Sequence, residues 1–251
     1  MKKLTTNLTL TAALTLALAT LAGLAHAEDA KPEAKPDNEV TYNVALTNDY
    51  RFRGLSQSRL DPAVQGGADY TNNPTGLYAG TWLSTIKWTK DAGGSGDVEW
   101  DIYGGKRGEI VKDVSYDVGG LYYFYPSNGL STNANTFELY GQIGYGPAYV
   151  KYSQSTTNLF GTADSKNSGY IDVGFNYEVA PSYTLNLHAG HQNVKNNSDF
   201  SYSDYKIGVT KDFGFMTVAL AAIKADTDVY VSPSGKSLAK TGVTLIVAKT
   251  F

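Results

Sequence analysis

Cysteine is absent from the 251 residues of the sequence, and proline and histidine are scarce, with 8 and 3 residues. Without cysteine the chain can form no disulfide, no thiolate metal site and no cysteine nucleophile. After Leu24 it also lacks any apolar run long enough for a membrane-spanning helix. The chain must therefore fold and act without thiol chemistry and without a helical anchor after that point.

Basic residues are fewer than acidic ones, with 21 Lys and Arg against 24 Asp and Glu. This balance offers no basic surface for nucleic acid. Glycine and tyrosine are abundant instead, with 26 and 19 residues. That composition favours an all-β chain with many tight turns.

The first 27 residues have the features of a secretory signal peptide. Lys2 and Lys3 precede an uncharged stretch that ends at Leu24, and Ala25-His26-Ala27 places small residues at a cleavage site. A retained membrane anchor is the alternative. Residues 28–39 mix charge, alanine and two prolines without an apolar pattern. We expect them to form a short periplasmic N-terminal tail.

Apolar and polar residues alternate with period 2 from Val40 to Phe251, which predicts about twelve strands. In the first strand the alternation sets an apolar face against a polar face, and it continues as far as Phe52 and Arg53. In the third, it predicts an outward face with Tyr78, Trp82, Ile86 and Trp88. Residues 215–224 are apolar on both faces, so the orientation of this strand stays open.

The connections between these strands alternate between short and long. The short turns are residues 72–75, 108–113, 144–147, 180–182 and 211–214, and the long polar connections are residues 55–62, 90–97, 126–135, 156–167, 193–201 and 225–240. Transmembrane β-barrels have this pattern, with short periplasmic turns and longer extracellular loops. A soluble β-sandwich, the alternative, has no reason to sort its loops by length. The sequence therefore predicts an antiparallel up-and-down transmembrane β-barrel over residues 40–251, in the bacterial outer membrane.

The polar faces of the predicted strands carry many charges, which a dry core could not accommodate but a watery lumen can. Nine are acidic: Asp49, Asp69, Glu99, Asp101, Asp117, Glu138, Asp172, Glu178 and Asp204. Six are basic: Arg51, Arg53, Lys87, Arg107, Lys151 and Lys206. The predicted pore-lining residues are Asp49, Arg51, Arg53, Asp69, Lys87, Glu99, Asp101, Arg107, Asp117, Glu138, Lys151 and Asp172. The excess of acids favours a slight preference for cations.

Asp49, Arg51 and Arg53 share a face near the extracellular end of the first predicted strand. Opposite Asp101 or Asp117 they would form a transverse field or an anion-binding constriction. Equally, they would pair with those acids and hold strand and loop in register. Both interpretations stay open at this point.

Other candidate sites carry less chemistry. His188 and His191 are three residues apart on a strand, so they point to opposite faces and cannot hold one metal ion together. Glu99 and Asp101 share a face and could bind a cation or act as acid and base, although a solvated lumen wall is the simpler interpretation. No local signature places a nucleophile beside His188, so we expect no enzyme, no metal and no cofactor.

Aromatic residues near the predicted strand ends, namely Tyr50, Trp88, Tyr116 and Tyr183, are expected to form girdles at the membrane interface, in contact with outer-membrane lipid and lipopolysaccharide. The sequence ends in Phe251 on an alternating strand. A terminal aromatic residue resembles the signal that the barrel-assembly machinery reads in outer-membrane proteins, although Lys249 departs from the usual apolar residue two places earlier.

Residues 47–58 (TNDYRFRGLSQS) resemble the opening motif of the TorF family, a group of exported proteobacterial proteins classed as porins but of poorly defined role. Residues 62–67 (PAVQGG), 76–80 (GLYAG), 99–105 (EWDIYGG) and 122–126 (YYFYP) extend the similarity. It is dense from Val40 to Gly146 and looser afterwards. The resemblance implies an outer-membrane barrel that acts as a porin, with no established substrate.

The sequence therefore predicts a porin for passive diffusion of ions or small polar solutes through a narrow lumen. Inward tyrosines such as Tyr103, Tyr123, Tyr140 and Tyr149 would narrow a barrel of about twelve strands. The alternative is a non-conducting structural or adhesive barrel that acts through its extracellular loops. A lipid-modifying barrel enzyme is a third hypothesis.

Overall fold

The computed structural model describes residues 36–251. The predicted signal peptide, residues 1–27, and most of the predicted tail lie outside this range. Among the described residues the only helical elements are α1 (Trp88–Asp91) and the 3-10 turn η1 (Ser198–Phe200). No helix in this range is long and apolar enough to cross a membrane.

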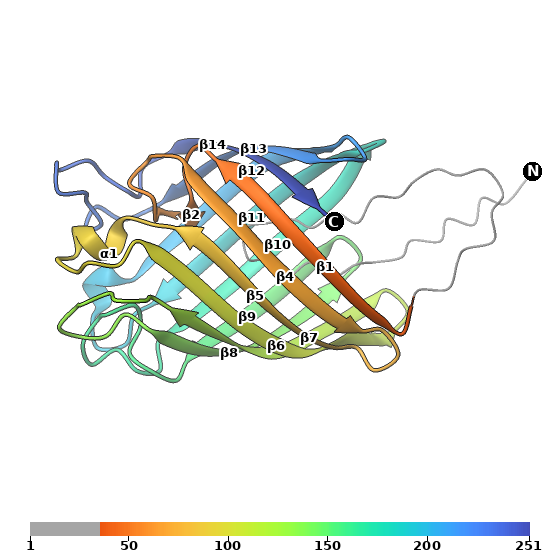
Figure 1. Cartoon of the computed structure of the whole chain (residues 1–251), viewed down its shortest axis with the longest axis horizontal. Helices are drawn as coiled ribbons and strands as arrows, with labels where there is room; N and C mark the ends of the chain where they lie inside the picture. Colours follow the sequence, from red (N-terminus) through yellow and green to blue (C-terminus); the bar gives the residue numbers. More distant parts are fainter. Residues whose placement is uncertain (1–35) are drawn as a thin grey trace, which may run out of the picture.

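The chain forms a closed antiparallel barrel of twelve strands (Figure 1). The strands of the barrel are β1 (Asn38–Thr47), β4 (Ala63–Asn72), β5 (Leu77–Thr85), β6 (Val98–Val111), β7 (Val114–Phe124), β8 (Thr136–Tyr145), β9 (Ala148–Ser155), β10 (Gly169–Ala180), β11 (Tyr183–Asn193), β12 (Tyr202–Asp212), β13 (Thr217–Ala225) and β14 (Gly242–Thr250). Each strand pairs with its neighbour in sequence, and β1 closes the barrel against β14, with Ala45 opposite Ala248. The predicted up-and-down barrel is confirmed.

Short and long connections lie at opposite ends of the barrel, as the sequence predicts. Figure 1 shows the long loops and α1 at one end and the short turns at the other, together with the C-terminus. Phe251 extends β14 by exchanging backbone hydrogen bonds with Tyr42 on β1. We call the end with the long loops the loop end and the other the turn end.

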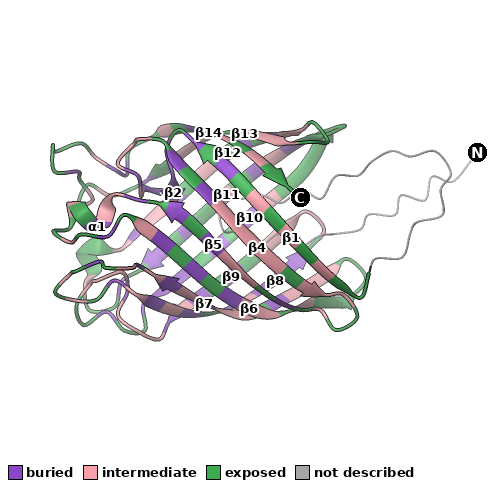
Figure 2. Ribbon diagram, in the orientation of Figure 1, coloured by how far each residue is buried: buried purple, intermediate pink, exposed green. Residues whose placement is uncertain are grey.

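Side chains alternate between the two faces of the wall, which Figure 2 shows as alternating buried and exposed bands along the strands. Large apolar side chains on the outer face are exposed on every barrel strand, for example Leu46, Ile102, Leu139, Val173, Ile207 and Val243. The inner face carries polar and aromatic residues, most of them buried. Such an inside-out arrangement has no soluble core, and it is the arrangement that a lipid-facing barrel needs.

Two strands differ from the sequence prediction or complete it. In β5 the predicted orientation is wrong, because Tyr78 and Trp82 are buried inside the barrel while Leu77 and Leu83 are exposed outside. An aromatic residue is apolar enough for lipid yet also packs inside a filled barrel, so alternation alone does not orient β5. In β13, left open by the sequence, Leu220 faces outward and Ala225 inward.

The chain between β1 and β4 does not continue the first strand outward. β1 ends at Thr47, and residues 48–62, which we call the inner loop, turn into the barrel and form a small hairpin of β2 (Arg51–Phe52) and β3 (Leu55–Ser56). Tyr50 is only 2 % exposed, so the predicted outward position of Tyr50 is wrong. The predicted long connection at 55–62 is part of this inward segment rather than a surface loop.

An aromatic cluster fills the barrel beneath the loop end on the side of β5 to β8. Its members are Tyr50, Ala63, Tyr78, Trp82, Ile86, Tyr103, Leu121, Tyr123, Tyr125, Ala134 and Tyr140. Trp88 packs against it rather than lying in an outer girdle. Nearer the turn end, Asn43, Asp69 and Arg107 are only partly buried, whereas Thr184 and Thr210 are buried. The interior is therefore packed at the loop end and more open toward the turn end on the side of β1, β4 and β6.

Candidate functional site

The inner loop is built around a tight two-residue turn. Phe52 pairs with Leu55, and the two residues between them, Arg53 and Gly54, have φ angles of 46° and 79°. Consecutive positive φ angles match the type I′ turn that a two-residue hairpin favours. Glycine adopts this conformation freely, whereas Arg53 is held there against its own preference. The turn carries the Arg53 side chain into the middle of the barrel.

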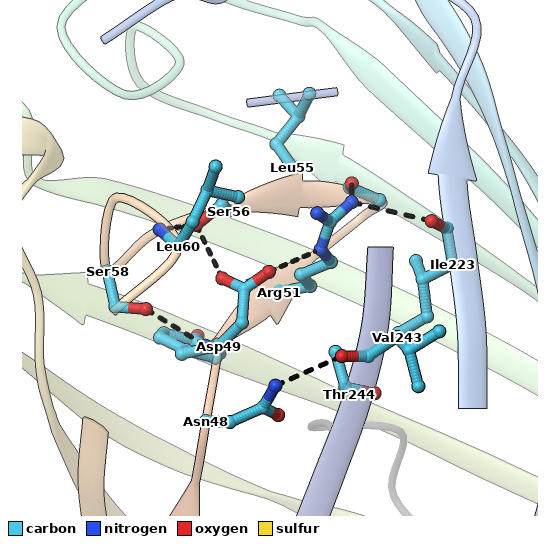
Figure 3. Close-up of polar contacts among 12 residues, drawn as sticks. Asn48, Asp49, Arg51, Leu55, Ser56, Ser58, Leu60, Ile223, Val243 and Thr244 are labelled. Carbon is cyan, nitrogen blue, oxygen red and sulfur yellow. Dashed lines mark hydrogen bonds and ion pairs between the residues drawn. The ribbon is translucent and has the colours of Figure 1, made fainter. Parts of the chain in front are cut away.

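Asp49 and Arg51 fix the base of the inner loop (Figure 3). Arg51 Nε donates to Asp49 Oδ2 at 2.7 Å, and Ser56 Oγ donates to Asp49 Oδ1 at 2.6 Å. Arg51 Nη1 also donates to the backbone carbonyls of Lys240 and Ile223, at 2.8 and 3.4 Å. Both partners lie at the far end of the sequence, so this one guanidinium ties the inner loop to the β13–β14 hairpin.

Arg53 reaches the opposite wall. Its two Nη atoms donate to the two oxygens of Glu138 at 3.0 and 2.7 Å, a bidentate ion pair, and Nη1 donates to Gln192 Oε1 at 2.6 Å. Its guanidinium carbon also lies 4.2 Å from the centre of the Tyr170 ring. Both charged side chains are almost fully buried, at 6 % and 3 % exposure. Such charge-assisted pairs are strong and directional, so Arg53 fixes the inner loop to β8 and β11. We call the contacts of Arg53 with Glu138 and Gln192 the latch.

Aromatic contacts seat the remainder of the loop. Tyr50 packs edge-on against Trp82, with ring centres 5.4 Å apart. Phe52 packs in the same manner against Tyr123 and Phe160, at 5.6 and 5.7 Å. Gly54 lies against β12, because a Cβ added there would stand 2.6 Å from the Cβ of Asp204. The inner loop therefore crosses the mouth of the barrel and contacts strands around most of the wall.

Two ion pairs join the inner loop to the connection that follows β5. Arg59 pairs with Asp91 at the end of α1, and Lys87 pairs with Asp61. The hydrogen bond from Lys87 holds the pKa of Asp61 below its ordinary value. Because the side chains of Lys87 and Asp61 are about half exposed, at 40 % and 49 %, this pair adds little to stability.

Four acids of the inner wall are bound by tyrosine hydroxyls. Tyr78 donates to Asp117 at 2.6 Å, Tyr103 to Asp69 at 2.7 Å, Tyr149 to Asp172 at 3.2 Å and Tyr170 to Asp204 at 2.8 Å. His188 lies between two of these acids, with Nδ1 2.9 Å from Asp172 and Nε2 2.7 Å from Asp204. The inward tyrosines therefore hold carboxylates as well as occupying space.

Glu99 and Asp101 are inward, as predicted, but they do not form a solvated wall. Glu99 is 1 % exposed and Asp101 is 0 % exposed. Tyr50, Tyr123 and Tyr125 surround them closely enough to interact with both carboxyl groups. The pair is therefore enclosed by the aromatic cluster and the inner loop.

The structure places the predicted pore-lining residues in three groups. The first group belongs to the inner loop and its latch: Asp49, Arg51, Arg53 and Glu138. Lys87 follows β5 and pairs with Asp61 at the edge of the inner loop. Glu99 and Asp101 are enclosed. The remaining five face the interior: Asp69, Arg107 and Asp117 toward the turn end, Lys151 near the middle of β9, and Asp172 three residues after the loop-end start of β10. The predicted pairing of the arginines with Asp101 or Asp117 is wrong, since their partners are Asp49 and Glu138.

Some contributors were outside the predicted set. Gln192 completes the latch, Tyr170 and His188 bind Asp204, and Lys206 faces the same wall. Their inward positions followed from strand alternation, but their partners lie on other strands and could not be read from local sequence. His191 points outward to Ser203, so the prediction that His188 and His191 face opposite sides is confirmed.

Comparisons with solved structures show similarity in fold. The structure described as KdgM porin aligns with a TM-score of 0.55 and 7 % sequence identity, over 84 % of this chain and 98 % of that one. A structure from a study of the in-meso crystallization of membrane proteins gives a TM-score of 0.51 and 10 % identity, over 84 % of this chain and 83 % of that one. Both show the barrel fold alone.

Other comparisons address the family. No curated protein matches the sequence. One family model covers residues 31–251, nearly all of the chain, under its own description and not under the TorF name. The chain belongs to that family, described as bacterial protein of unknown function (Gcw_chp).

Proposed function

We propose that this protein is a narrow outer-membrane channel for the passive diffusion of ions or small polar solutes. The observation that carries the proposal is the closed barrel with an apolar outer face and a charged, hydrogen-bonded inner face. Only a closed barrel lets strands cross hydrocarbon without unpaired backbone groups. A polar interior toward the turn end gives a solute a path that lipid does not. The fold shared with a structure named as a porin fits this role.

The inner loop is the constriction in this proposal. It lies across the mouth, and it is held by the bidentate pair between Arg53 and Glu138 and by the contacts of Arg51. Charged side chains on an inward segment reduce the bore and select solutes by charge. Passage depends on the space beside this segment or on its displacement.

The test is single-channel recording of the purified protein in planar bilayers. A loop variant, in which a short Gly-Ser linker replaces residues 49–61, lacks the constriction and is recorded beside the unchanged protein. We expect small conductance steps from the unchanged protein and larger steps from the variant. A variant with the same conductance as the parent would exclude the inner loop as the constriction.

A second candidate function is a non-conducting barrel that acts at the cell surface through its loops. The packing of the loop end favours it, because inward residues there such as Thr136, Ser155 and Glu138 are at most 2 % exposed. If neither the protein nor the loop variant gives conductance steps, this second function replaces the channel. Steps from the loop variant alone would show a barrel that the inner loop keeps shut.

The location and the partners belong to the same proposal. The exposed apolar outer face would contact outer-membrane lipid and lipopolysaccharide, and Phe251 would be read by the barrel-assembly machinery. Cleavage after Ala27 is proposed for export. Fractionation of the membranes and N-terminal sequencing of the mature protein test the location and the cleavage site.

A further inference from the structure

Four acids of the inner wall are engaged by neighbouring groups. Asp117 accepts a hydrogen bond from Tyr78, Asp172 and Asp204 contact His188, and Glu138 is paired with Arg53. These four acids are also well covered, at no more than 5 % exposure. Their number therefore overstates how much negative charge a solute would meet.

Three cations on the same wall are in a different state. Arg107, Lys151 and Lys206 have no carboxylate oxygen within 4 Å of their charged nitrogens among residues 36–251. Arg107 donates to the Thr71 hydroxyl, and Lys151 Nζ lies 4.1 Å from the centre of the Tyr140 ring. Arg107 and Lys206 are only partly buried, whereas Lys151 is 9 % exposed. We call these three residues the cation row.

Strand register explains how the cation row forms. Arg107 on β6 pairs across the sheet with Asp117, Lys151 on β9 pairs with Asp172, and Lys206 on β12 pairs with His188. Asp117 interacts electrostatically with both Arg107 and Lys151, and Asp172 with both Lys151 and Lys206. Cations and covered acids therefore alternate along one inner wall.

The wall formed by β13 and β14 carries no inward acids. The inward residues of β13 and β14 are small or apolar: Thr217, Ala219, Ala221, Ile223, Ala225, Gly242, Thr244, Ile246, Ala248 and Thr250. Short side chains leave the most room on this side, opposite the bulkier aromatic side of the barrel. Five inner-face acids toward the turn end are at least partly exposed, and each accepts a hydrogen bond: Asp69 from Tyr103, Glu39 from Asn73, and Glu109, Glu178 and Asp212 from backbone N–H groups of the adjacent turns.

We propose that the cation row makes the channel prefer small anions, such as chloride or a small carboxylate or phosphate solute. This inference rests on the proposed channel function and specifies its solute class. It reverses the cation preference expected from the count of nine acids and six bases, because hydrogen bonding, ion pairing and burial withdraw the acids beside the cation row from the solute. Rows of Lys and Arg are the usual means by which pores select anions.

The reversal potential of the purified protein in a KCl gradient tests the charge preference. We expect a potential of the sign that chloride permeation gives. Lys151→Gln, Lys206→Gln and Arg107→Gln should each reduce the chloride-to-potassium permeability ratio about sixfold. One unit charge roughly 8 Å from an ion in water changes the permeability of chloride and of potassium by a factor of about 2.4 each, in opposite directions. Lys151→Arg keeps the charge and should keep the ratio.

Lys106→Gln is the matched control, because Lys106 precedes Arg107 on β6 but is exposed on the other face. It should leave the ratio unchanged. A cation-selective channel, or a ratio that no cation-row variant alters, would overturn the inference while leaving the channel in place. Absence of conductance would instead overturn the channel.

A second readout does not depend on conduction. Crystals of the protein soaked in bromide should show anomalous density beside Lys151 and Lys206, and crystals of the Lys206→Gln variant should lose it at that residue. Bromide at these sites in a barrel that does not conduct would support the anion site and exclude the channel function. Crystals without bromide at either lysine would contradict the anion site directly.

Discussion

At the scale of single residues, tyrosine hydroxyls and carboxylates are matched across the interior. Period-2 alternation predicted correctly that residues such as Asp117 and Asp172 point inward. It could not predict that Tyr78 binds Asp117, since 39 residues separate them and the β5 orientation was misjudged. Which charges stay open to a solute depends on these distant partners, and so a count of acids and bases in the sequence does not determine the selectivity.

Glu138 is the residue whose loss should destabilise the barrel most clearly. Glu138→Gln removes the charge that pairs with Arg53 and leaves a buried guanidinium without compensation. We expect a loss of about 3–5 kcal/mol in the free energy of unfolding, as for other broken buried ion pairs. Urea unfolding in lipid vesicles, followed by tryptophan fluorescence, measures it.

The matched control is Glu109→Gln, the same change at an exposed residue near the turn end. It should alter the free energy of unfolding by less than about 1 kcal/mol. Equal losses for the two variants would show that the latch contributes nothing special to stability.

Gly54 tests the seating of the inner loop. Gly54→Ala places a Cβ 2.6 Å from the Cβ of Asp204 in a backbone conformation with φ of 79°. Gly235→Ala has nearly the same φ, 77°, and nothing within 4 Å of the added atom. Both should lose about 1–2 kcal/mol from the left-handed backbone. Only Gly54→Ala should lose more and make the inner loop accessible to protease, as limited proteolysis with mass spectrometry would reveal.

At the scale of elements, all twelve barrel strands were predicted, because alternation and turn residues are local signals. The inner loop was not, because Tyr50 and Phe52 continue the same alternation while the backbone leaves the wall after Thr47. Alternation states that two faces differ, and it does not state which face meets lipid. β5 shows the same limit, since its aromatic face lies inside.

Strand β13 offers a direct test of which face meets lipid. Leu220 is 53 % exposed at the middle of the strand, while its neighbour Ala219 faces inward among small residues. Leu220→Lys should lower the free energy of unfolding in lipid vesicles by about 2–4 kcal/mol, the cost of lysine at the bilayer midplane. Ala219→Lys, facing the lumen, should be tolerated much better. The reverse order would place β13 the other way round.

At the scale of the whole molecule, alternation of short and long connections predicted the topology without reference to any side-chain contact. Closure between β1 and β14 followed from the need to leave no free edge in lipid. How tightly the interior packs could not follow from these rules, because it depends on where the inner loop lies. The candidate site was therefore predicted as a set of inward charges and not as a built constriction.

Phe251 tests how the whole barrel is assembled in the cell. Its backbone bonds with Tyr42 remain possible in Phe251→Ala, so the variant should refold into lipid vesicles as well as the parent does. In cells, the fraction that reaches the folded, heat-modifiable form should fall if the ring is read during assembly. Phe213→Ala, at an exposed residue near a turn, is the control. Normal assembly of Phe251→Ala in cells would remove the proposed recognition.

The hydrogen bonds from Arg51 to Ile223 and Lys240 have a consequence for the order of folding. The segment that carries Arg51 is synthesised early, while the carbonyl groups that accept its hydrogen bonds belong to the final hairpin. The guanidinium has no place to dock until that hairpin has joined the wall. An early stretch of chain thus completes its fold last, and its docking marks a barrel whose seam has already closed.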